Sequence, residues 1–133
     1  MTPEFLAAVI DTLLPGDDVL PSGTVAGVQL AADAHRSILD AIATDAGGMI
    51  AFVGADEASR ASVMRRVERA TPDGFRALLV ALSSDYYEST AVLAALGWRI
   101  EPPQPSGHSI PHGSDATTRQ LERVRQRQKL WRE

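Results

Sequence analysis

One stretch of the sequence has a strong helical repeat. Between Pro72 and Gly97, large side chains recur at intervals of three and four residues, at Phe75, Leu78, Leu79, Leu82 and Tyr86. This spacing places them on one stripe of an α-helix, which must be buried against other elements. Pro72 and Asp73 suit the first turn of that helix. Proline has no N–H to leave unpaired, and aspartate accepts hydrogen bonds from the next amides.

A short return helix is predicted directly after this central helix. Ser89 or Thr90 can cap it, the apolar run 91–96 forms it, and Gly97 ends it in the left-handed conformation that glycine tolerates. We expect the remaining helices to pack around this pair.

Further helices follow from capping residues and breakers. Thr2 and Pro3 begin a helix that Pro15 stops, and Thr24 is predicted to open a helix running to about residue 43. The apolar run 49–53 fits strand or helix, and its helical neighbours favour helix. Later helices are expected over 57–71 and 116–131. The sequence therefore predicts an all-α fold, a single compact domain of about five to six helices with an extended proline-rich segment before the last helix.

Charge and proline content divide the chain into three parts. Residues 1–101 form the predicted helical body, residues 102–113 a proline-rich arm, and residues 114–133 a basic C-terminal helix. Residues 1–115 carry 7 basic and 15 acidic side chains, whereas residues 116–133 carry 6 basic and 2 acidic ones. The body is therefore acidic and the tail basic.

The sequence lacks the residues that several kinds of metal, cofactor and nucleophilic chemistry require. There is no cysteine, which removes thiolate metal sites, iron–sulfur ligation and cysteine nucleophiles. No nucleophile elbow, HExxH pair or glycine-rich nucleotide fingerprint is present. We therefore expect no catalytic residue, no cofactor and no metal in this chain, although an enzyme assembled from distant residues stays open.

Two possible metal sites in the sequence have simpler interpretations. The adjacent Asp17 and Asp18 lack the spacing of a calcium loop, so capping of turns is favoured for them. His108 and His112 have the spacing of a helical metal pair, but Pro111 between them is incompatible with a helix there.

The basic last helix has two interpretations. Nucleic-acid binding is one. The other is contact with an acidic protein surface, of this chain or of a partner. The acidic isoelectric point, about 5.3, and the lack of an aromatic platform favour the second. We therefore expect no nucleic-acid partner. No apolar run approaches the roughly 20 residues that span a bilayer, so no membrane span is expected.

The order of several motifs resembles a known family. The run from Val9 to Asp18 is followed by Ala26-Gly27-Val28, then by Phe75-x-x-Leu78 and Ser84-Asp85-Tyr86-Tyr87, and then by Leu96-Gly97-Trp98 and the stretch 102–107. Over roughly residues 5 to 107 this pattern resembles the small subunit of gluconate 2-dehydrogenase, called subunit 3 or the gamma chain. Asp85 stands where that family usually has a glycine, and the twin-arginine leader common in the family is absent here.

The resemblance implies an all-helical, non-catalytic subunit. Its partner would be the catalytic subunit of a flavoprotein oxidoreductase of the glucose–methanol–choline type, which carries FAD and oxidises a sugar, a sugar acid or a glycoside. The small subunit would support folding, stability, assembly or export of that partner. The residues expected to bind the partner come from the loop, the tyrosine pair, the arm and the tail: Pro15, Gly16, Asp17, Asp18, Tyr86, Tyr87, Trp98, Pro102, Pro103, Pro105, Gly107, His108 and Trp131.

An alternative from another class is a stand-alone small helical enzyme or ligand-binding protein, with a pocket near Tyr86 and Tyr87. As the sequence stands, the expected location is the cytoplasm. Removal of a leader, or export of the complex, would place the protein in the periplasm.

Overall fold

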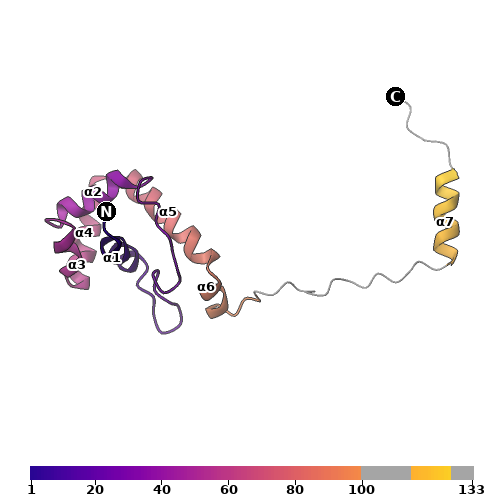
Figure 1. The fold of residues 1–133 in the computed structure, drawn as a ribbon, viewed down its shortest axis with the longest axis horizontal. Helices are drawn as coiled ribbons and strands as arrows, with labels where there is room; N and C mark the ends of the chain where they lie inside the picture. The colour runs from indigo at the N-terminus through magenta and orange to yellow at the C-terminus, as the bar shows by residue number, and fades with distance from the viewer. Residues whose placement is uncertain (100–114, 127–133) are drawn as a thin grey trace, which may run out of the picture. The chain divides into compact units, whose positions relative to one another are not determined.

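The computed structural model describes residues 1–99 and 115–126. It divides the chain into two units, residues 1–100 and 101–133. The described residues form helices and connecting turns, with no strand among them (Figure 1). The predicted all-α class is therefore confirmed.

The first unit begins with α1, Pro3–Leu13, which starts as its sequence predicts. The Thr2 hydroxyl accepts a hydrogen bond from the Phe5 N–H at 3.3 Å, and Pro3 occupies the first turn. The helix ends just before Pro15, where the chain turns away. Its inward face contributes Phe5, Val9 and Ile10 to the core.

The predicted helix over residues 24–43 is wrong in its first half. Residues 14–35 contain only turns and bends, and α2 spans Arg36–Asp45. Thr24 does not cap a helix, because its N–H and hydroxyl are both bound to the Asp11 carboxylate of α1. Gly27 then adopts a left-handed φ of 80°, which ends the short turn over residues 22–28 before a helix can propagate.

The next three helices agree with their sequence patterns. The run 49–53 is helical, as favoured, and forms α3, Met49–Gly54. Asp56 caps α4, Glu57–Ala70, by accepting the Ser59 N–H at 2.7 Å. The long helix α5, Pro72–Glu88, buries Phe75, Leu78, Leu82 and Tyr86, and Leu79 is partly buried against the core.

The short return helix is also present as α6, Thr90–Ala95. The Gly97 N–H donates to the Ala94 carbonyl and the Trp98 N–H to the Leu93 carbonyl, each at 2.9 Å, while Gly97 has a φ of 73°. These two bonds form a Schellman motif, which satisfies the last carbonyls of the helix. Ser89 stands at the N-cap, but its side chain bonds elsewhere.

The core of the first unit lies between α1, α2, α4 and α5, with α3 packed on α1 and α2 (Figure 1). The Phe5 and Phe52 rings meet edge to face with centroids 5.6 Å apart. Arg60 of α4 stacks over the Phe52 ring and donates to the carbonyls of Phe52 and Val53. This contact closes the C-terminal end of α3, whose six residues are too few for a helix that is stable on its own.

The second unit contains α7, Asp115–Gln126. The predicted helix over 116–131 is confirmed as far as Gln126, and residues 127–133 lie outside the described part. Within residues 1–99 and 115–126, no helix combines the length and apolar character needed to cross a membrane.

We expect Leu78→Ala in α5 to lower the free energy of unfolding by about 2–5 kcal/mol, because it leaves a cavity at a fully buried position. Val80→Ala in the same helix removes a side chain that is 61% exposed, so it should change stability by less than about 0.5 kcal/mol. Urea unfolding followed by circular dichroism measures both. Equal losses would contradict this placement of the core.

Candidate functional site

Residues from three of the motifs meet at one place, where the segment 14–29 lies against the C-terminal end of α5. We call this place the loop–helix junction and define it by residues 14–29 and 85–89. Because the segment is irregular, its backbone groups need partners outside helices. Most of the partners described below are side chains of α1, α5 and the segment itself.

Asp11 fixes the middle of the segment to α1. Its carboxylate accepts the Thr24 N–H at 2.9 Å and the Thr24 hydroxyl at 2.8 and 2.7 Å. The Gly23 N–H also donates to the Leu14 carbonyl, at 2.8 Å. A Cβ on Gly23 would lie 2.5 Å from Ile10 Cγ2. The segment therefore touches the helix where only glycine fits.

Asp17 organises the turn that follows Pro15. Its Oδ1 accepts the Val19 and Leu20 N–H groups at 2.8 and 2.7 Å, and its own N–H donates to the Leu20 carbonyl at 2.9 Å. These backbone bonds lower the pKa of the Asp17 carboxyl below its usual value. Asp17 therefore closes a turn, which is the interpretation the sequence favoured over calcium binding.

Gly16 is the tightest point of that turn. Its φ is 72°, and a Cβ built there would lie 2.5 Å from the Ser22 nitrogen and 2.7 Å from the Pro21 carbonyl carbon. Both neighbours are backbone atoms, so a small rotation of a side chain does not relieve the clash.

The end of α5 binds the far side of the segment through three side chains. The Tyr86 hydroxyl donates to the Pro21 carbonyl at 2.7 Å, and the Ser89 hydroxyl donates to the Ala26 carbonyl at 2.7 Å. Asp85 Oδ2 accepts the Gln29 N–H at 2.6 Å. Asp85, which departs from the family pattern, therefore has a structural role: glycine at that position would leave this N–H without the bond.

Tyr86 and Tyr87 have different roles, although the sequence grouped them as contact residues. Tyr86 is 4% exposed and belongs to the core, whereas Tyr87 is 57% exposed. Their rings meet edge to face at 5.4 Å. Burial raises the pKa of the Tyr86 hydroxyl, and nearby Tyr87 and Asp17 act in the same direction. Tyr86 therefore positions the junction, and only Tyr87 presents its ring to the surface.

The remaining predicted contact residues divide between the surface and the undescribed part of the chain. Pro15, Asp17 and Asp18 are exposed, Gly16 is half-buried, and Trp98 is 69% exposed. The predictions for Pro102, Pro103, Pro105, Gly107, His108 and Trp131 lie outside the described residues. Leu96 is 46% exposed but is not among the contact residues predicted from the sequence. An apolar residue in a helical run is usually predicted to lie in the core.

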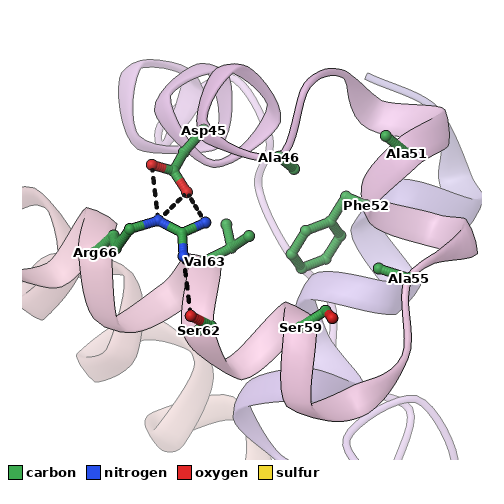
Figure 2. Close-up of a pocket in the computed structure, with 9 residues that line it drawn as sticks. All are labelled: Asp45, Ala46, Ala51, Phe52, Ala55, Ser59, Ser62, Val63 and Arg66. Atoms are coloured by element: carbon green, nitrogen blue, oxygen red, sulfur yellow. Dashed lines mark hydrogen bonds and ion pairs between the residues drawn. The ribbon is translucent and has the colours of Figure 1, made fainter.

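A second surface feature is a hollow of about 240 Å³ between α2, α3 and α4 (Figure 2). Phe52 and Val63 form part of its lining, and Arg66 stands at its edge. The Arg66 guanidinium donates to the Asp45 carboxylate at 2.6 and 2.9 Å and to the Ser62 hydroxyl at 2.9 Å. This pair raises the pKa of Arg66. Because both side chains are partly exposed, the pair links α2 to α4 weakly, and Asp45 neutralises the arginine.

The described residues contain no group of three or more histidine, cysteine, aspartate or glutamate side chains placed to hold a metal ion. His108 and His112 lie outside the described residues. No family model, curated protein or solved structure matches this chain.

We expect Gly16→Ala to lower the free energy of unfolding by about 3 kcal/mol, because the new methyl group meets backbone atoms and the residue keeps a left-handed φ. Gly27→Ala is the matched control. Gly27 has a φ of 80° but open space around it, so this substitution should cost about 1–2 kcal/mol, from the backbone conformation alone. Chemical denaturation measures the difference. An equal cost for the two variants would show that the turn is looser than described.

We expect Tyr86→Phe to lower the free energy of unfolding by about 1 kcal/mol at neutral pH and to speed proteolysis within residues 14–29, because the Pro21 carbonyl loses its donor. Tyr87→Phe changes an exposed ring and should have little effect. Since folding raises the Tyr86 pKa, the stability it contributes is present below pH about 10 and is lost as the pH rises through the folded-state pKa. This alkaline loss should be smaller in Tyr86→Phe. A loss of the same size in both proteins would contradict the assignment.

Proposed function

We propose that this chain is the non-catalytic, gamma-type small subunit of a heteromeric FAD-dependent dehydrogenase that acts on a sugar, a sugar acid or a glycoside. Its partner is the flavoprotein catalytic subunit of the glucose–methanol–choline type, which carries the FAD. The chain supports folding, stability or assembly of that partner and has no catalytic turnover by itself.

The observation that carries this proposal is that residues of three of the motifs lie together at the loop–helix junction. The run from Val9 to Asp18, the Ala26-Gly27-Val28 motif and the Ser84 to Tyr87 motif are distant in the sequence. Asp11 of the first motif binds Thr24, and Asp85 and Tyr86 of the third bind Gln29 and Pro21. All three partners lie in the segment that contains the second motif. Three parts of the pattern therefore lie in one structural unit, which supports treating these three parts as a single feature.

Exposed side chains at the ends of α5 and α6 support a role in protein contact. Tyr87 at the end of α5 and Leu96 and Trp98 at the end of α6 are 57%, 46% and 69% exposed. We call these three residues the exposed rim. Tyrosine and tryptophan are enriched in protein interfaces because they offer a large apolar area together with a polar group. The rim is therefore the proposed contact of the first unit with the flavoprotein.

The junction and the end of α6 give the rim a defined backbone. Tyr87 follows directly after Tyr86, which is anchored to Pro21, and the N–H of Trp98 is fixed to Leu93. A contact surface that is ordered before binding loses less conformational entropy when the complex forms. This is the property expected of a subunit whose purpose is to hold another protein.

These contacts do not support the alternative function, a ligand pocket beside Tyr86 and Tyr87. The Tyr86 hydroxyl, the group that such a pocket would use as an acid, is buried and already donates to Pro21. A hydroxyl committed to a backbone carbonyl is poorly placed to serve a ligand.

The test is a pull-down of the tagged chain from its native cell, followed by mass spectrometry and a flavin absorption spectrum of the eluate. We expect a flavoprotein of the stated type at a fixed ratio to the chain, with the FAD bands in the complex. The chain alone should show no flavin and no dehydrogenase activity. Turnover by the purified chain alone, or flavin bound to it without a partner, would overturn the proposal.

We expect the double variant Tyr87→Ser, Trp98→Ser to bind the co-purifying flavoprotein at least about tenfold more weakly, because aromatic anchors carry much of the energy of an interface. Ile50→Ser is the matched control, since Ile50 is 90% exposed but lies on α3. Surface plasmon resonance compares the dissociation constants. If Ile50→Ser weakened binding as much as the rim variant, the rim would not be the contact surface.

A further inference from the structure

The segment 14–29 is attached to the rest of the first unit mainly by polar groups. Within these residues, the only large side chain that is buried is that of Val28. Helix α5, in contrast, buries several large side chains, Leu78 and Leu82 among them. Because burial of apolar surface is the main favourable contribution to folding, the segment is held to the core less strongly than the helices around it.

The contact between the segment and α1 is also incomplete. A hollow of about 310 Å³ lies between them, and its lining includes Leu6 and Ile10 of α1 and Gly27 and Val28 of the segment. A Cβ built on Gly27 would meet no atom within 4 Å. Side chains that border such a space lose dispersion contacts on that side. The segment therefore lies over the apolar side of α1 without packing closely against it.

Hydrogen bonds hold the segment on two sides. At the end of α5, the hydroxyls of Tyr86 and Ser89 and the carboxylate of Asp85 bind its backbone. We call these three side chains the latch. On the α1 side, the Gly23 N–H donates to the last carbonyl before the segment turns away, and the Thr24 N–H donates to a carboxylate of α1.

The two sets of bonds alternate along the chain. Gly23 and Thr24, which are bound to the α1 side, lie between Pro21 and Ala26, which are bound to the latch. A single residue separates the α1-bound pair from the latch-bound residue on either side. Displacement of one bound residue therefore pulls directly on the next. Groups that are connected in this way open together, as one cooperative unit.

We propose that the segment 14–29 is a lid over the apolar side of α1, which opens as one body while the helices stay folded, and whose release is controlled by the latch. The backbone at Gly23 lies against Ile10, and Leu6 borders the hollow, so both α1 side chains lose their cover in the open state. The first unit then has two states, with this apolar surface covered or exposed. The lid needs no partner and does not depend on the proposed function.

Amide hydrogen exchange of the full chain, followed by NMR, tests the lid under conditions in which exchange rates report the equilibrium between closed and open forms. The N–H groups of Gly23 and Thr24 report on the lid, and that of Leu82 reports on the helical core. The latch variant is Asp85→Ala. Its matched control is Glu88→Ala, because both substitutions remove one carboxylate from the last turn of α5, and Glu88 is exposed.

We expect the Gly23 and Thr24 amides to share one opening equilibrium and, after correction for intrinsic rates, to exchange at least about a hundredfold faster than Leu82. Asp85→Ala should speed exchange of both amides about tenfold, although Asp85 binds neither of them, because it removes a hydrogen bond to a charged group that closes the lid. Leu82 should be unaffected, and Glu88→Ala should leave all three amides unchanged.

A second latch variant, Ser89→Ala, removes a bond between neutral groups and should speed exchange of the same two amides about threefold. Three results would overturn the proposal. The first is exchange of Gly23 and Thr24 as slow as that of Leu82, which would mean that the segment opens only when the whole unit unfolds. The second is an effect of Asp85→Ala that is confined to the Gln29 amide. The third is an equal effect of Glu88→Ala, which would assign the change to charge at the end of the helix.

Discussion

The first unit depends on how an irregular segment satisfies its backbone groups. Residues 14–35 lie between α1 and α2 without forming a helix, and long connections of this kind are uncommon in small domains. Three carboxylates accept N–H groups from the segment, those of Asp11, Asp17 and Asp85. The hydroxyls of Tyr86 and Ser89 donate to its carbonyls. Without these bonds the backbone N–H and carbonyl groups of the segment would lack hydrogen-bond partners. The segment would then no longer connect the end of α1 to the end of α5.

Much of the helical framework follows from local features that are visible in the sequence. The stripe from Phe75 to Tyr86 is buried along α5, and Thr2, Asp56 and Gly97 act at helix ends as their residue types predict. Such features act within a few residues, so no knowledge of the tertiary structure is needed to recognise them. Periodicity alone does not distinguish strand from helix for the short run 49–53. The helical segments on either side of it favour helix, and the run is helical in the structure.

The junction could not be predicted in the same way, because its bonds join residues far apart in the chain. Val25, Val28 and Leu30 resemble the apolar positions of a helix, but Thr24 is bound to Asp11, and Gln29 to Asp85 across 56 positions. Tertiary bonds and the left-handed Gly27 override the local helical pattern. Tyr86 and Tyr87 are neighbours with opposite environments, and only the direction of α5 relative to the segment decides which one is buried.

The Schellman motif at the end of α6 has a practical consequence for anyone who works with this protein in solution. It places Trp98 on a fixed backbone with its indole largely in water, and the chain has only one other tryptophan, Trp131, which belongs to the second unit. Each unit thus carries its own intrinsic fluorophore. With one indole replaced, the emission wavelength of the other reports the polarity around a single unit, so the two halves of the chain can be followed separately without any added label.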